Sequence, residues 1–128
     1  EQVFQILLDV SSFKPDMEDH QAIFTKFNEQ KNTTAICADI DGQIVGFASI
    51  FYIIRVRGGS MAIIEDVAVA REWRGCGIGR QLVEELMHDA RKKRVTKTIL
   101  EASDAARSLY QKHGFEASGI LMKKVFGK

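Results

Sequence analysis

Cysteine is scarce in this chain, and neither sign of charge dominates. Only Cys37 and Cys76 occur in 128 residues, too few for a disulfide framework, so we expect a reducing, cytoplasmic setting. Lys and Arg number 18 against 17 Asp and Glu, for a formal net charge of +1. This balance gives no support for a partner that is nucleic acid or a membrane surface. No apolar run approaches the roughly 18 residues of a membrane-spanning helix, and no signal peptide is visible.

The sequence also lacks histidine and cysteine residues at the short spacings that are typical of metal ligands. His20, His88 and His113 are scattered along the chain, so we predict no metal site. Cys37 lies between Ala and Ile in an apolar segment, which predicts buried packing, and Cys76 lies in a glycine-rich turn.

That turn belongs to the most informative stretch, residues 65–86. Residues 65–70 are apolar and β-branched enough for a buried strand, and glycines then recur at positions 75, 77 and 79. From Ile78 on, apolar residues fall at helical spacing. The first N–H groups of a helix lack intrahelical partners and carry positive dipole character, so a glycine turn at this point predicts a phosphate or pyrophosphate site.

The spacing of the glycines in this turn distinguishes between known kinds of phosphate-binding motif. The chain lacks the Gly-Lys-Ser/Thr of a P-loop, and residues 75–79 have the wrong spacing for the dinucleotide fingerprint. Arg74-x-x-Gly77-x-Gly79 instead resembles the Arg/Gln-x-x-Gly-x-Gly/Ala signature of the GNAT superfamily of N-acetyltransferases. A second stretch, residues 103–115, resembles the later family motif Asn-x-x-Ala-x-x-Leu-Tyr-x-x-x-Gly-Phe, with Ser103 in place of Asn. The resemblance extends over residues 34–126.

The resemblance implies an α/β (α+β) chain with the GNAT fold, a mixed and mostly antiparallel central sheet flanked by helices. Two splayed strands of that fold form the acetyl-coenzyme A cleft. We expect a single domain over residues 1–128. The strand with which relatives usually begin is not readable here.

Periodicity and turn residues predict the order of elements. Asp41-Gly42 is a two-residue hairpin signal, and Gly114 is placed to end a helix. The expected helices are residues 1–10, 19–30 (with Ile23, Phe24 and Phe27 inward), 77–93 and 104–113; the expected strands are 34–40, 43–54, 61–70, 96–101 and a closing strand 120–126. The strand–helix–strand from Ile64 to Leu100 should be a parallel crossover.

Two residues are candidates for catalysis. Tyr110 matches the family tyrosine that often protonates the departing thiolate, and a phenol pKa of about 10 suits that transfer; the alternative is a half-buried tyrosine on an amphipathic helix. Strand alternation places Glu65 and Asp66 on opposite faces. We prefer Glu65 as the general base, with a structural or substrate-orienting role as the alternative, and expect Asp66 to face solvent or pair with a helix. Glu101 is a weaker base candidate, and many relatives use ordered water.

The resemblance also implies a coenzyme site. Backbone groups of the strand before the turn would pair with pantetheine, and the turn and its arginines would surround the pyrophosphate. Ser103 can cap its helix, and its reach to the coenzyme is shorter than that of Asn. The residues assigned to coenzyme binding are Val67, Ala68, Val69, Arg74, Gly75, Cys76, Gly77, Ile78, Gly79, Arg80 and Ser103.

The function that the resemblance implies is direct transfer of an acetyl group from acetyl-coenzyme A to a primary amine of a small molecule or protein. Residues 64–67 and Leu100-Glu101 also look similar to glucosamine-6-phosphate N-acetyltransferases. An aminoglycoside-type acceptor would suit an acidic cleft instead. A different class is a non-catalytic acyl-coenzyme A sensor or dimerisation module. Proteins of this family are often dimers, and a homodimer is left open.

Overall fold

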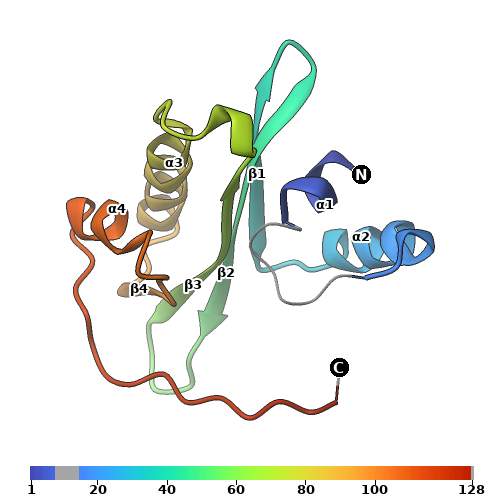
Figure 1. Cartoon of the computed structure of the whole chain (residues 1–128). Helices are drawn as coiled ribbons and strands as arrows, with labels where there is room; N and C mark the ends of the chain where they lie inside the picture. Colours follow the sequence, from blue (N-terminus) through green and yellow to red (C-terminus); the bar gives the residue numbers. More distant parts are fainter. Residues whose placement is uncertain (8–14, 128) are drawn as a thin grey trace.

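The computed structural model describes residues 1–7 and 15–127, and the structural statements below concern those residues. The predicted order of helices and strands is confirmed up to α4, with shifted bounds (Figure 1). The elements are α1 (Gln2–Leu7), η1 (Met17–Asp19), α2 (His20–Asn28), β1 (Thr33–Ile40), β2 (Gln43–Ile54), β3 (Ser60–Val69), η2 (Arg71–Trp73), α3 (Ile78–Lys92), β4 (Lys97–Leu100) and α4 (Arg107–Lys112). Residues 8–10 of the first expected helix lie outside the described residues.

The four strands form one sheet in the order β1-β2-β3-β4. The first three are antiparallel neighbours, and β4 is parallel to β3, so the sheet is mixed and mostly antiparallel as predicted. Asp41 and Gly42 have φ values of 50° and 85°. Two successive left-handed residues match the two-residue turn that fits the twist of a β-hairpin.

Helices cover both faces of the sheet. In Figure 1, α3 and α4 lie on one side of the strands, and α1 and α2 lie on the other. The buried stripe of α3 is the one that the sequence predicts: Ile78, Leu82, Val83, Leu86 and Ala90. On the opposite face, Phe27 of α2 contacts Phe47 and Phe51, with ring centroids 6.3 and 6.2 Å apart. Phe24 was expected inward, but it is 38% exposed, because α2 turns only one edge toward the strands.

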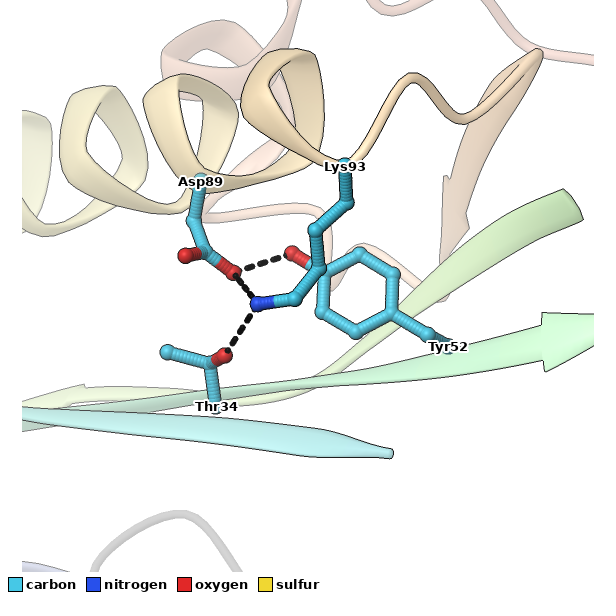
Figure 2. A network of polar contacts seen from close by, with 4 residues as sticks. All are labelled: Thr34, Tyr52, Asp89 and Lys93. Atoms are coloured by element: carbon cyan, nitrogen blue, oxygen red, sulfur yellow. Dashed lines mark hydrogen bonds and ion pairs between the residues drawn. The ribbon is translucent and has the colours of Figure 1, made fainter. Parts of the chain in front are cut away.

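Polar contacts fix the C-terminal end of α3 to the sheet (Figure 2). Tyr52 of β2 donates a hydrogen bond to Asp89, and the ammonium group of Lys93 lies 3.0 Å from Asp89 and 3.2 Å from Thr34 of β1. Burial raises the pKa of Asp89, but the hydrogen bonds from Tyr52 and Lys93 outweigh it and leave the pKa below its usual value. The carboxylate therefore stays charged and joins α3 to two strands.

Two further expectations about the fold are wrong. Residues 120–126 form no strand: they run extended below the turn between β2 and β3 (Figure 1). Their apolar pattern favours a strand, but a strand also needs a neighbour for its backbone hydrogen bonds, and within residues 15–127 this segment pairs with none. Cys37 is exposed rather than buried, because its neighbours Ile36 and Ala38 take the core-facing positions of β1.

The described residues before β1 contain helices only, and the absence of the usual first strand stays a prediction. Within residues 1–7 and 15–127, none of the helices combines the length and the apolar character needed to cross a membrane.

Candidate functional site

Strand β3 is open along half of one edge. β4 pairs with β3 only from Met61–Lys97 to Ile64–Leu100, whereas β3 continues to Val69. On its other edge, β3 remains paired with β2, where Val67 faces Ala48 and Val69 faces Gly46. The backbone of residues 65–69 therefore has no strand neighbour on the β4 side in the described part of the chain. Such an edge offers N–H and C=O groups to an extended ligand.

The glycine turn leads from this edge to the start of α3. Gly75 and Gly77 have φ values of 82° and 84°, and a Cβ built on either would meet no protein atom within 4 Å. Both positions suit glycine because other residues rarely adopt this conformation. The space beside them is open for a ligand to approach the backbone closely.

The first turn of α3 leaves backbone N–H groups available to a ligand. The N–H of Gln81 donates the first helical bond to Gly77 O, over 3.1 Å. Gly77 is the N-cap and brings no side chain to cap the helix, and no acidic residue lies in the first turn. The preceding N–H groups, those of Ile78, Gly79 and Arg80, therefore have no helical acceptor. These donors, the helix dipole and the open glycine turn fit the pyrophosphate of a coenzyme.

The side chains around this turn differ in what they can supply. The side chain of Ile78 is buried in the core, so only its N–H can reach a ligand. Arg74 Nε donates to the carbonyl of Val69 over 3.2 Å, which brings this guanidinium to the open end of β3. Arg80 pairs with Glu84 at 3.7 Å and remains 66% exposed. Cys76 is exposed in the turn.

Helix α4 packs against the same turn. A Cβ built on Gly79 would lie 3.7 Å from Leu109 Cδ2 and 3.8 Å from Val69 Cγ2. The first turn of α3, the end of β3 and α4 therefore meet at Gly79. A methyl group at position 79 would make ordinary van der Waals contacts, whereas a longer side chain directed the same way would press on Leu109 and Val69.

Tyr110 follows Leu109 on α4 and is 8% exposed. Its ring meets Phe115 edge to face, with centroids 5.8 Å apart. Burial raises the pKa of Tyr110, so the phenol keeps its proton at neutral pH. Among the described residues its hydroxyl has no hydrogen-bond partner, and it can therefore give that proton to a ligand.

The acidic pair on β3 sits at a β-bulge. Ile64 pairs with Ile50 and Asp66 pairs with Ser49, so Glu65 is the extra residue. Before the bulge Ala62 and Ile64 belong to the core facing α3, and after it Val67 and Val69 pack on that core. The simple alternation predicted for Glu65 and Asp66 is therefore wrong, because a bulge shifts it by one position.

The two carboxylates have different surroundings. Partial burial raises the pKa of Glu65, and the charges of Asp66 and Glu101 raise it further. Asp66 is half-buried rather than solvent-facing, and it accepts a hydrogen bond from Ser49 Oγ over 3.4 Å. Burial raises the pKa of Asp66, while the bond from Ser49 lowers it in part. A carboxylate with a raised pKa holds protons more readily near neutral pH.

We expect Asp66→Asn to raise the thermal midpoint at pH 7.5, because it removes a partly buried charge and keeps an oxygen that Ser49 can reach. The pKa of Asp66 is raised in the folded state, so its charge lowers the free energy of unfolding above that pKa and not once the carboxylate is protonated. The increase in thermal midpoint from Asp66→Asn should therefore become smaller as the pH falls through the raised pKa. Calorimetric melting from pH 4 to 8, with the exposed Asp104→Asn as the matched control, measures this. An equal gain at all pH values would contradict the assignment.

Ser103 lies at the entry to α4. Its hydroxyl accepts a hydrogen bond from the N–H of Ala106, 3.3 Å away, in the turn before the helix. The expected capping of the helix is wrong, because α4 begins at Arg107 with Ala106 as its N-cap and has no side-chain capping bond. Glu101 is exposed just beyond β4. Among the described residues, no three His, Cys, Asp or Glu side chains are grouped to hold a metal ion.

A separate hollow of about 290 Å³ lies between α1 and the strands. It contains none of the residues predicted for the coenzyme site. Its lining comprises Gln2, Gln5, Ile6, Gln43, Ile44, Ala70, Arg71 and Glu72.

Sequence reasoning missed two contributors to this site. Ser49 is fully buried and bonded to Asp66; a single polar residue inside the apolar run of residues 45–54 was the available signal. Leu109 brings α4 to Gly79. It is the leucine of the second motif, but the motif does not indicate that this leucine contacts the glycine turn.

Comparison with known proteins identifies relatives. The model of the acetyltransferase (GNAT) family matches residues 1–115. A glucosamine 6-phosphate N-acetyltransferase of Trypanosoma brucei brucei is 37% identical over 87 residues, which cover 66% of this chain and 59% of that protein. The chain thus spans less than two thirds of the length of that curated relative.

Solved structures share the fold. The crystal structure of a Trypanosoma brucei acetyltransferase superimposes with a TM-score of 0.83 at 26% identity, covering 98% of this chain and 91% of that one. A predicted acetyltransferase of Clostridium acetobutylicum, solved with acetyl-coenzyme A, gives a TM-score of 0.79 at 21% identity, covering 96% and 85%. The second likeness concerns the fold alone.

Proposed function

Because the chain belongs to the GNAT family of acetyltransferases, we propose that it transfers an acetyl group from acetyl-coenzyme A directly to a primary amine. The observation that carries the proposal is the meeting of three features at Gly79: the open edge of β3, the uncapped start of α3, and the helix that holds Tyr110.

Coenzyme binding would rest mainly on backbone groups. Acetyl-coenzyme A supplies the acetyl group as an activated thioester. The N–H groups of Ile78, Gly79 and Arg80 would hold its pyrophosphate, with Gly75, Cys76 and Gly77 leaving room for it and Arg74 and Arg80 adding positive charge. Residues 67–69 would pair with the pantetheine arm, with Ser103 at the margin.

Two side chains would act as general base and general acid. When a neutral primary amine attacks the thioester, a C–N bond forms and the C–S bond breaks. The nitrogen must lose one of its two protons, and the sulfur leaves as a thiolate that takes up a proton. Glu65, whose raised pKa lies closer to neutrality, would take the proton from the amine, directly or through water. Tyr110, which stays protonated, would give its proton to the departing thiolate.

A second candidate is narrower: glucosamine 6-phosphate as the acceptor. The 37% identity to the trypanosomal enzyme of that name favours it. The carboxylates of Glu65, Asp66 and Glu101, near the point where β3 and β4 separate, would suit an amine. Binding the phosphate of a sugar phosphate would also require cationic side chains. We therefore propose a primary amine as the acceptor in general and glucosamine 6-phosphate as one particular case.

Release of free thiol from acetyl-coenzyme A tests both proposals. The purified chain is mixed with acetyl-coenzyme A and a panel containing glucosamine 6-phosphate, glucosamine, an aminoglycoside and a lysine-bearing peptide. Amine-dependent thiol release supports the transferase, and release with glucosamine 6-phosphate well above glucosamine supports the narrower acceptor. Binding of acetyl-coenzyme A without thiol release on any acceptor would overturn the catalytic proposal and favour a sensor.

A further inference from the structure

Helix α4 is too short to hold Tyr110 in place by its own hydrogen bonds. It comprises only Arg107–Lys112, and Ala106 at its N-cap makes no side-chain capping bond. At its other end the chain turns back, and the N–H groups of His113 and Phe115 both donate to the carbonyl of Tyr110, over 3.0 and 3.1 Å. Isolated helices of this length are not stable in water. The position of the Tyr110 side chain therefore depends on the contacts that α4 makes with the rest of the protein.

The side chain of His113 connects the end of α4 to α3. Its Nδ1 lies 2.9 Å from the carbonyl oxygen of Leu109, and because a carbonyl can only accept, Nδ1 carries the proton of this hydrogen bond. Its Nε2 lies 3.8 Å from Oε1 of Glu84 on α3. The side chain is only 13% exposed, so the imidazole is held between the two helices.

Glu84 also contacts the proposed pyrophosphate site. The same oxygen, Oε1, lies 3.7 Å from Nε of Arg80, which belongs to the first turn of α3 and is assigned to the coenzyme. A phosphate beside Arg80 competes with Glu84 for the guanidinium group. A carboxylate released in this way can turn to His113, whose Nε2 donates to it when the imidazole is protonated at both nitrogens. One carboxylate therefore joins the coenzyme site to the helix that holds Tyr110.

We propose that His113 is a positioning residue, which through Glu84 fixes α4 against α3 and so holds the phenol of Tyr110 at the thioester sulfur once Arg80 engages the coenzyme. Its effect is on turnover, because it sets where the proton donor lies. Coenzyme affinity depends instead on the backbone N–H groups of α3 and on Arg80. This inference rests on the proposed acetyl transfer and adds to it a residue that itself touches neither coenzyme nor acceptor.

The variant Glu84→Gln distinguishes this role from a merely structural one, because its two expected effects have opposite directions. Loss of the charge frees Arg80 and should tighten coenzyme A binding by about twofold to fivefold, the range for an exposed ion pair. Loss of the contact with His113 should lower turnover by about fivefold or more, as expected for a misplaced proton donor. Titration calorimetry with coenzyme A and steady-state turnover with acetyl-coenzyme A measure the two effects.

Glu85→Gln is the matched control, because Glu85 is the neighbouring exposed carboxylate on α3. It should leave affinity and turnover close to those of the unmodified chain. Equal coenzyme affinity in the two glutamine variants, or unchanged turnover in Glu84→Gln, would overturn the proposal.

Two variants of His113 test its link to Tyr110. Asparagine keeps an N–H near the place of Nδ1, which can still donate to Leu109, but it is too short to reach Glu84; phenylalanine loses both contacts. We expect His113→Asn and His113→Phe to lower turnover alike, by about fivefold or more. Neither should lower it further in the Tyr110→Phe background, because a positioning residue has no effect once the hydroxyl that it positions is gone.

Wild-type turnover in His113→Asn would reduce His113 to a cap on the carbonyl of Leu109 and overturn the proposal, as would an undiminished loss in the double variant. Thiol release by the unmodified chain separates this failure from that of the proposed function. If no amine gives release, the transferase is overturned and the positioning role with it. If release is amine-dependent and the His113 variants turn over normally, only the positioning role is overturned.

Discussion

Replacing Tyr110 by phenylalanine should lower turnover at least about tenfold, because a positioned proton donor typically contributes about 10²–10⁴-fold. The ring is buried against Phe115, and the hydroxyl has no partner in the described part of the chain, so Phe keeps the packing and removes only the hydroxyl group that would donate the proton. Affinity for acetyl-coenzyme A should change little, because the proposed coenzyme contacts lie on β3 and α3. Steady-state turnover and calorimetric binding measure the two effects separately.

Tyr52→Phe is the matched control. It also removes one tyrosine hydroxyl, but that hydroxyl bonds Asp89 at the far end of α3 (Figure 2). We expect a lower thermal midpoint and near-normal turnover for this variant. Wild-type turnover in Tyr110→Phe would remove the acid role and leave Tyr110 as a packing residue.

Gly77→Ala should weaken acetyl-coenzyme A binding by about tenfold or more, equivalent to roughly 1.4 kcal/mol. The added methyl group would project into the open space beside the helix start, where the proposed pyrophosphate lies. The left-handed conformation would also become strained, at a cost of about 1–2 kcal/mol. Titration calorimetry with acetyl-coenzyme A and thermal melting separate binding from stability.

The control for this variant is Gly42→Ala. Gly42 has a φ of 85° and, like Gly77, no protein atom within 4 Å of a built Cβ, so the backbone strain should be similar. It lies in the β1–β2 hairpin, outside the proposed site. Equal coenzyme affinity in the two alanine variants would show that the turn does not hold the pyrophosphate.

Local signals predicted much of the fold and of the proposed coenzyme site. The Asp41-Gly42 hairpin, the buried stripe of α3 and the stop at Gly114 each depend on backbone preferences or periodicity within a few residues. The positive φ values at Gly75 and Gly77 likewise follow from a turn that only glycine tolerates well. Each of these features depends only on residues close together in the chain, so the sequence alone is enough to predict it.

Long-range pairing explains what the sequence could not predict. The bulge at Glu65 depends on the register between β2 and β3, and no residue type marks the extra position. Residues 120–126 have a strand pattern, but whether they pair depends on a neighbour that the pattern does not specify. The half-buried position of Asp66 follows from its pairing with Ser49, which again is a property of two strands together.

The bare backbone at the start of α3 has a consequence for how such an enzyme would be inhibited. Amide donors that hold a diphosphate cannot distinguish the acetylated coenzyme from the free thiol left after the reaction. Spent coenzyme should therefore compete with fresh acetyl donor for the same place. Any preference between them must come from the few atoms around the acetyl group, where β3 and β4 part.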